Sequence, residues 1–263
     1  MASKNKKKVH HDLSIVLQII ILSILLSLVW AMLIGKIFDR YVPAETPLPI
    51  VILQKERREP IPTPTSFTEI SHGDHSKKQV IFTFDAGSGQ GSAREILAAL
   101  AKHKVKGSFF LVGRWVEENP DLTRQMVADG HEIFNHSYSH PYYTKLSAEE
   151  IQKDLTKMDD ILYTTAGVRT KPYFRPPYGD RNAASNAAAA AIGYRSIYWS
   201  IDTLDWREGE TKEAVKARIY NNLHNGAIIL MHVGTTVTGE VLDEIFTKLE
   251  ADGYKLVSLT EGL

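Results

Sequence analysis

The sequence predicts an α/β protein whose globular part is a distorted (β/α) barrel of about seven parallel strands, preceded by a single transmembrane helix. Two observations predict the barrel: short apolar runs alternate with amphipathic stretches from Val80 onward, and polar clusters follow five of those runs. A third observation, the uncharged apolar segment from Leu13 to Gly35, predicts the membrane helix.

Apolar runs separated by helical stretches indicate βα units with a parallel sheet. The predicted strands are Val80 to Phe84, Gly107 to Leu111, Glu132 to Asn135, Tyr173 to Arg175, Arg195 to Ser200, Ala227 to Met231 and Lys255 to Ser258. Between them, Asn119 and Pro120 supply an N-cap and a first-turn proline, and Ser147 to Glu150 form a capping box. A doubly wound sheet is the alternative, but it would concentrate its polar site near one switch point.

The N-terminal part is predicted to tether the barrel to the cell membrane. We expect a basic cytoplasmic tail at 1–12, the membrane helix at 13–35, a proline-rich extracellular linker at 36–71 and the globular domain at 72–263. More lysines precede the span than follow it, so the positive-inside rule places the N-terminus in the cytoplasm and the domain outside. A cleaved signal peptide is the alternative, but no small-x-small cleavage site follows the apolar run.

The composition excludes several classes of partner and site. The chain has 31 Lys plus Arg and 31 Asp plus Glu. This balance lacks the basic excess of nucleic-acid-binding proteins, so we expect no nucleic-acid partner. The chain has no cysteine, so any metal must be held by histidine and carboxylate side chains.

Five polar clusters are predicted to converge on the C-terminal mouth of the barrel, where barrel enzymes place their catalytic groups. They are Thr83 to Gly87, His136 to His140, Arg175 to Gly179, Asp202 to Trp206 and Leu230 to His232. His136 and His140 share one face of a helix or tight turn and are candidate ligands of one divalent ion. The alternative is a pair of polar residues on an exposed loop.

Asp85 ends an apolar strand, which makes it a candidate general base or metal ligand, with a turn Asp as the alternative. Gly87 to Gly91 lacks the lysine and the spacing of a phosphate cradle, and we interpret it as a flexible turn. Arg175 precedes two prolines, a rigid setting in which it can orient Asp85 and turn the Tyr178 backbone N–H outward.

Asp205 and His232 follow two further strands and form a possible pair that raises the basicity of the imidazole. Trp206 lies beside Asp205 and could supply an aromatic wall. Taken singly, these residues could also be a surface ion pair and a core tryptophan.

The order of the five clusters resembles that of the polysaccharide deacetylases, the family with the NodB homology domain (carbohydrate esterase family 4). The resemblance covers roughly Gln79 to the C-terminus, and five ordered motifs are together a specific signal. It implies a distorted barrel of seven or eight strands and removal of N- or O-acetyl groups from polymers such as peptidoglycan and chitin.

The resemblance also implies a role for each matching residue. Asp85 matches the catalytic base, His136 and His140 the metal-binding histidines, Arg175 the arginine that holds the base, Tyr178 the backbone N–H that faces the oxyanion, Asp205 the carboxylate that tunes the catalytic histidine, Trp206 and Leu230 the walls of the acetyl pocket, and His232 the general acid.

Ala86 departs from the family pattern, which usually reads Thr-Phe-Asp-Asp-Gly and uses its second Asp as a third metal ligand. A methyl group cannot coordinate a metal, and hydrolytic zinc sites normally have three protein ligands. We therefore expect a weakly held divalent metal, zinc first, with cobalt or nickel as alternatives. A water molecule or Asp85 could take the missing place.

The expected function is metal-dependent hydrolysis of acetyl groups on an N-acetylated cell-wall or related polysaccharide, with release of acetate. A catalytically impaired glycan-binding module is one alternative, because of Ala86. A hydrolase of another acyl or amide substrate is a second, because one fold hosts many chemistries. The identity of the glycan and the oligomeric state stay open.

Overall fold

The computed structural model describes Trp30 and residues 69–263. The chain divides into a unit at Met1–Glu59 and a unit at Pro60–Leu263. The predicted cytoplasmic tail, the membrane helix apart from Trp30, and the linker up to residue 68 lie outside the described residues. Within the described residues, no helix is both long enough and apolar enough to cross a bilayer.

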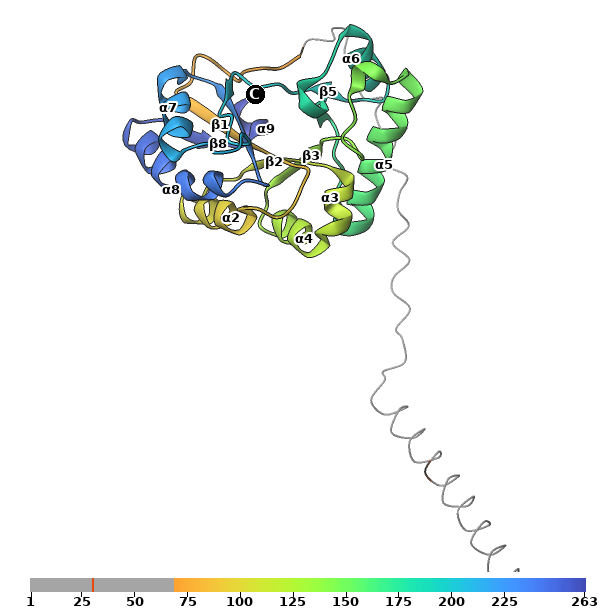
Figure 1. Cartoon of the computed structure of the whole chain (residues 1–263), viewed down its shortest axis with the longest axis horizontal. Helices are drawn as coiled ribbons and strands as arrows, with labels where there is room; N and C mark the ends of the chain where they lie inside the picture. The colour runs from red at the N-terminus through yellow and green to blue at the C-terminus, as the bar shows by residue number, and fades with distance from the viewer. Residues whose placement is uncertain (1–29, 31–68) are drawn as a thin grey trace, which may run out of the picture. The chain divides into compact units, whose positions relative to one another are not determined.

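A parallel sheet of eight short strands forms the centre of the second unit (Figure 1). The strands are β1 (Gln79–Ala86), β2 (Ser108–Leu111), β3 (Glu132–Asn135), β4 (Tyr173–Phe174), β5 (Arg195–Ser196), β6 (Ile201–Asp202), β7 (Ala227–His232) and β8 (Lys255–Val257). Seven of them follow the order β5-β4-β3-β2-β1-β7-β6, and β8 pairs with β1. Every ladder between these strands is parallel, which confirms the predicted α/β sheet.

The predicted strand Arg195 to Ser200 is correct only at its start, because β5 covers Arg195–Ser196 and a separate strand, β6, follows at Ile201–Asp202. β5 pairs with β4, whereas β6 pairs with β7. Among the described residues no ladder joins β5 to β6, so the sheet is a curled half-barrel. The segment from Ile70 to His72 lies across this opening, where Ile70 forms a β-bridge with Ile197 and His72 forms one with Ala227. Residues assigned to the linker are therefore part of the fold.

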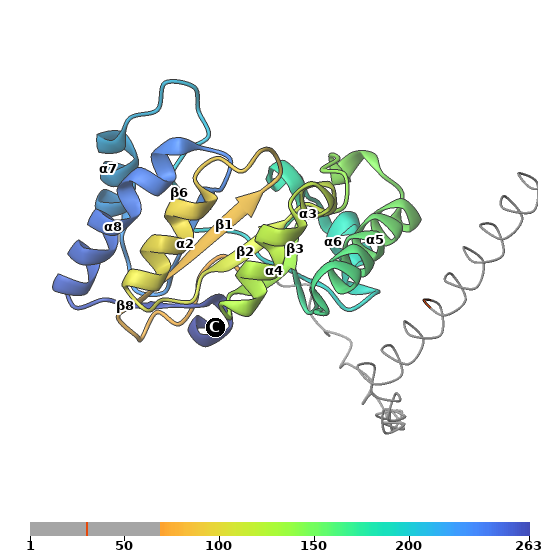
Figure 2. The same ribbon diagram turned by 90° about the horizontal axis from the view of Figure 1, so that it is seen from below.

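Helices cover the outside of the curled sheet, and α2 and α4 lie across β1 and β2 (Figure 2). The helices are α2 (Ala93–Lys102), α3 (Gly113–Glu118), α4 (Pro120–Ala128), α5 (Ala148–Ala166), α6 (Ala183–Ala190), α7 (Lys212–Asn222), α8 (Thr236–Ala251) and α9 (Leu259–Gly262).

Both helix starts predicted from capping signals are observed. Pro120 opens α4, and Ser147 and Glu150 exchange the two hydrogen bonds of a capping box on α5. The Asn119 side chain does not cap α4 as predicted, because its Oδ1 accepts a hydrogen bond from Gln90 Nε2 at 2.8 Å.

Strand β1 separates two parts of the core, because successive side chains of a strand point to opposite faces. Phe82, Phe84 and Ala86 belong to the large apolar cluster that the helices complete. Ile81 belongs to a second cluster on the inner face, and the alternation places Asp85 on this same face. The half-barrel interior thus receives Asp85, whereas the Ala86 side chain is buried against the helix layer.

The C-terminal helix α9 covers the N-terminal end of β1. Gln79 Nε2 donates to the Gly262 carbonyl at 2.9 Å. A Cβ atom on Gly262 would come within 2.5 Å of the Ile81 side chain, so only glycine allows this approach. With this end covered, polar side chains collect at the opposite end, where the strands terminate.

Candidate active site

A buried ion pair between Asp85 and Arg175 forms the centre of the site. Arg175 Nη1 lies 2.6 Å from Asp85 Oδ1, and the two side chains are 0% and 6% exposed. The other guanidinium nitrogens donate to the carbonyl oxygens of Tyr198, at 3.1 Å, and Ile197, at 3.4 Å. The predicted contact between Arg175 and Asp85 is confirmed.

The surroundings of Asp85 favour its ionised form. Burial opposes ionisation, but the Arg175 guanidinium, followed by the neighbouring His136 and His232 side chains, outweighs it and lowers the pKa of Asp85. Asp85 is therefore a carboxylate at neutral pH and can accept a proton. Its role as the base stays a prediction.

His136 and His140 are brought together by a tight turn rather than a helix. The backbone is left-handed at Ser137 (φ 72°) and His140 (φ 59°). The His140 backbone N–H donates to Ser137 Oγ at 2.8 Å. As a result the two Nε2 atoms lie 3.2 Å apart, and His136 Nε2 lies 3.4 Å from Asp85 Oδ2.

Both imidazoles are in the neutral form that binds metals. His136 Nδ1 donates to the Arg175 carbonyl at 2.9 Å, which leaves the lone pair on Nε2. Burial lowers the pKa of His136, and burial, followed by the neighbouring His136 imidazole, lowers the pKa of His140 to about 3.

The donor atoms fit a divalent metal in part. The facing Nε2 atoms of His136 and His140 suit one ion. Across the part of the chain that the structure describes, however, no group of three or more His, Cys, Asp or Glu side chains could hold a metal. Asp85 has one oxygen engaged by Arg175, and Ala86 is fully buried on the outer face. The chain therefore offers two imidazole ligands.

Asp154 of α5 holds the turn that carries the two histidines, and the sequence analysis did not identify it. Its carboxylate accepts hydrogen bonds from the Tyr138 backbone N–H and Ser139 Oγ, both at 2.9 Å, and from the Tyr143 hydroxyl at 3.1 Å. A lone aspartate on an amphipathic helix carries no sequence signal of this role.

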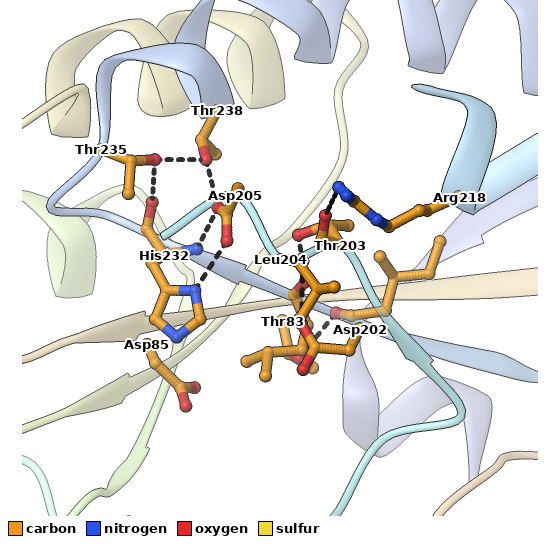
Figure 3. Close-up of polar contacts among 12 residues, drawn as sticks. Thr83, Asp85, Asp202, Thr203, Leu204, Asp205, Arg218, His232, Thr235 and Thr238 are labelled. Carbon is orange, nitrogen blue, oxygen red and sulfur yellow. Dashed lines mark hydrogen bonds and ion pairs between the residues drawn. The ribbon is translucent and has the colours of Figure 1, made fainter. Parts of the chain in front are cut away.

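His232 and Asp205 form a second pair beside Asp85 (Figure 3). His232 Nδ1 lies 2.7 Å from Asp205 Oδ1, and the His232 backbone N–H donates to Oδ2 at 2.7 Å. Thr238 at the start of α8 also donates to Asp205 Oδ2. The predicted pair is confirmed, whereas Thr238 was missed because its contact depends on how α8 packs.

The pairing changes the proton affinity of His232. Burial opposes protonation, but the hydrogen bond and charge of Asp205, then the charges of Asp85 and Asp202, raise the pKa of His232. With Nδ1 bound to Asp205, Nε2 is the nitrogen that faces Asp85 in Figure 3.

Three predicted pocket residues lie in different settings. Tyr178 is left-handed (φ 57°) and 59% exposed, and its ring contacts those of His140 and Tyr142. Leu230 is buried on β7. Trp206 is 55% exposed, and no hydrogen bond, ion pair or ring contact joins it to another predicted site residue in the described part of the chain. Their pocket roles stay predictions.

The turn after β1 is anchored, in contrast to the flexible turn expected at Gly87 to Gly91. Trp115 Nε1 donates to the Gly89 carbonyl. Gly91 has φ 43°, and a Cβ there would come within 2.2 Å of the Val233 carbonyl oxygen. Glycine at position 91 therefore packs this turn against the end of β7.

Comparison with known proteins relates the chain to deacetylases of bacterial cell walls. It is 32% identical to the Bacillus subtilis peptidoglycan-N-acetylmuramic acid deacetylase PdaA, over 72% of this chain and 73% of the relative. It is 34% identical to a Bacillus cereus peptidoglycan-N-acetylglucosamine deacetylase, over 71% of this chain and 69% of the relative. These relatives are hydrolases.

Among solved structures, the chain is similar to Bacillus anthracis BA3943, described as a CE4 family pseudoenzyme. The TM-score is 0.71 at 36% identity, covering 75% of this chain and 69% of that one. A BA3943 mutant described as having restored enzymatic activity gives the same TM-score and identity, covering 75% and 71%. The family model for polysaccharide deacetylase matches residues 72–197. The chain belongs to the polysaccharide deacetylase family.

Proposed function

We propose that the chain hydrolyses the acetyl amide of an N-acetylated cell-wall glycan, of which peptidoglycan is the first candidate, and releases acetate. One observation carries this proposal: Asp85 and His232 are register partners on β1 and β7, and each has its own oppositely charged partner. A carboxylate and an imidazole held side by side provide a base and an acid in one site.

The two residues divide the proton transfers. Asp85, ionised and fixed by Arg175, accepts a proton from the attacking water. The water oxygen forms a bond to the acetyl carbon, and the carbonyl oxygen becomes an oxyanion, which in this proposal accepts a hydrogen bond from the Tyr178 backbone N–H. His232, held by Asp205, donates its proton to the sugar nitrogen as the C–N bond breaks.

His136 and His140 are the residues that would hold a divalent metal, zinc being the first candidate. Such an ion polarises the acetyl carbonyl and stabilises the charge that develops on its oxygen. The turn bound by Asp154 orients both imidazoles before any ligand arrives.

A glycan-binding role with impaired catalysis is the second candidate. Ala86 removes the usual third ligand, and the similar protein BA3943 is described as a pseudoenzyme. The intact pairs at Asp85 and His232 favour catalysis over this alternative, because a protein that only binds glycan has no need of both.

We further propose that the domain lies outside the cell, tethered to the membrane through Leu13 to Gly35. The length of this uncharged segment and the lysines before it support the proposal. Protease added to intact cells should digest the domain and leave a protected N-terminal fragment. A domain that is digested only after lysis would contradict this orientation.

The deacetylase proposal predicts acetate release from peptidoglycan or N-acetylglucosamine oligomers by the full-length chain supplied with a divalent metal. The Asp85→Asn variant should lose at least about 100-fold in rate, since general-base catalysis contributes this much. Acetate is measured in an enzyme-coupled assay with zinc, cobalt and nickel in turn. If no ion supports release, the glycan-binding alternative replaces the proposal.

The Cβ of Ala86 points to the helix layer, but position 86 ends β1 beside Gly87, where a Cβ would lie 3.9 Å from His140 Cδ2. A longer Asp side chain can turn from there toward the two imidazoles, so the Ala86→Asp variant is expected to bind zinc about tenfold or more tightly and to release acetate faster. Without metal it should be less stable than the wild type, since Ala86 is fully buried and a buried carboxylate is costly. Zinc titration and thermal melts with and without zinc measure both effects.

The matched control is Ala86→Asn, which adds the same volume without a charge. If Asp and Asn change zinc affinity equally, position 86 is not a ligand position in this chain.

The Asp205→Asn variant tests the acid. Asp205 raises the pKa of His232, so protonated His232 persists to higher pH in the wild type. Activity that needs this proton is lost as pH rises through the pKa of His232. In the variant, the alkaline limb of the kcat/KM profile should move to lower pH, with a loss of about 10- to 100-fold in rate. An unmoved alkaline limb would exclude His232 as the acid.

A further inference from the structure

A third carboxylate lies in the mouth, and the proposed reaction does not use it. Asp202 ends β6 and pairs in register with Leu230 of β7, while Leu230 pairs with Thr83 of β1. Side chains that are paired across parallel strands face the same side of a sheet. Asp202, Leu230 and Thr83 therefore lie on the inner face, the face that also carries Asp85 and His232. Figure 3 shows Asp202 in the same view as these two residues.

Asp202 has no charged partner, unlike the other two carboxylates of the mouth. Asp85 is paired with Arg175, and Asp205 with His232. Within residues 69–263, Asp202 forms no ion pair, and its only hydrogen bond is from the Leu204 backbone N–H to Oδ1, at 2.9 Å.

The nearby basic side chain from α7 is committed elsewhere. Arg218 donates to the Thr203 carbonyl at 2.7 Å and forms an ion pair with Glu210 at 3.0 Å. It therefore does not neutralise Asp202. The charges of the paired side chains cancel, so the inner face of the mouth keeps one unpaired negative charge, that of Asp202. Within residues 69–263 its Oδ2 atom has no hydrogen-bond donor and can accept one from a ligand.

In the absence of a cation, the surroundings of Asp202 raise the free energy of its ionised form. Burial, followed by the like charges of Asp205 and Asp85, raises the pKa of Asp202 against the opposing effects of Leu204 N–H and His232. A positive group placed beside Asp202 would offset this cost, since opposite charges a few ångströms apart in a partly buried site attract strongly.

Deacetylation creates such a positive group from the sugar nitrogen. The sugar nitrogen takes one proton from His232 as the C–N bond breaks and becomes an amine, and this amine takes up a second proton from water to become an ammonium group. We propose that Asp202 receives this ammonium group, so that the mouth binds glycans with free amino sugars more tightly than fully acetylated ones. The inference rests on the proposed function for the position of the sugar nitrogen, but it needs no turnover.

Binding of two defined tetrasaccharides tests the proposal. β-1,4-linked glucosamine tetramer and its fully N-acetylated form are titrated calorimetrically into the full-length chain at pH 7 and low salt. The wild type should bind the glucosamine tetramer about tenfold or more tightly. This preference should shrink as salt is raised, because screening weakens the charge pair.

The Asp202→Asn variant should lose the preference while binding the acetylated tetramer within about twofold of wild type. Asn keeps an acceptor oxygen for the Leu204 N–H, so the local turn is retained. The control Asp252→Asn removes the same charge beyond α8, where Asp252 pairs with Lys248, and should keep the preference. If Asp202→Asn does not fold, Asp202→Glu keeps the charge and should keep the preference.

The proposal is overturned if the wild type shows no preference, if neither tetramer binds, or if Asp202→Asn retains the preference. These outcomes are separate from failure of the deacetylase proposal, which is judged by acetate release alone. A chain that prefers the amino sugar but releases no acetate would support Asp202 as the ammonium site in a protein that recognises deacetylated glycan.

Discussion

The buried pair of Asp85 and Arg175 is the interaction on which the rest of the site depends. Arg175 follows β4 on one side of the half-barrel and Asp85 is the next-to-last residue of β1, so their contact joins distant strands across the interior. The Arg175 carbonyl also accepts from His136, which sets the lone pair of that imidazole. Removing one partner would leave an unpaired buried charge, which typically costs about 3–5 kcal/mol. Fold and chemistry are thus coupled through a single guanidinium.

The alternation of side chains along β1 explains both what the site contains and what it lacks. Asp85 faces the interior, where Arg175 and His232 meet it, while Ala86 faces the helices and packs among apolar side chains. A protein that loses a carboxylate at position 86 gains apolar packing and loses none of the inner-face ion pairs. The Asp85–Arg175 and Asp205–His232 pairs can therefore persist in a chain that has alanine at position 86.

Much of the fold and of the site could be predicted because both follow from short-range patterns. Apolar runs predict the strands, and the polar residues that follow them predict which side chains meet at the mouth. This pattern predicted the Asp85–Arg175 and Asp205–His232 contacts. The break after Ser196 could not be predicted, since the chain from Arg195 to Asp202 supplies two short strands, β5 and β6, at opposite ends of the sheet. Asp154 and Thr238 act from helices, so their contacts depend on packing that leaves no local pattern.

The segment that bridges the two ends of the half-barrel gives the domain a mechanical property. Glu69 binds Arg181 and Ile70 exchanges backbone hydrogen bonds with Ser196 and Tyr198, all close to where the chain enters the domain. A force applied to the chain from its N-terminal side would act on these contacts before it acted on β1. Tension that opened them would detach residues 69 and 70 from the chain around β5 while β1 and its neighbours stayed paired.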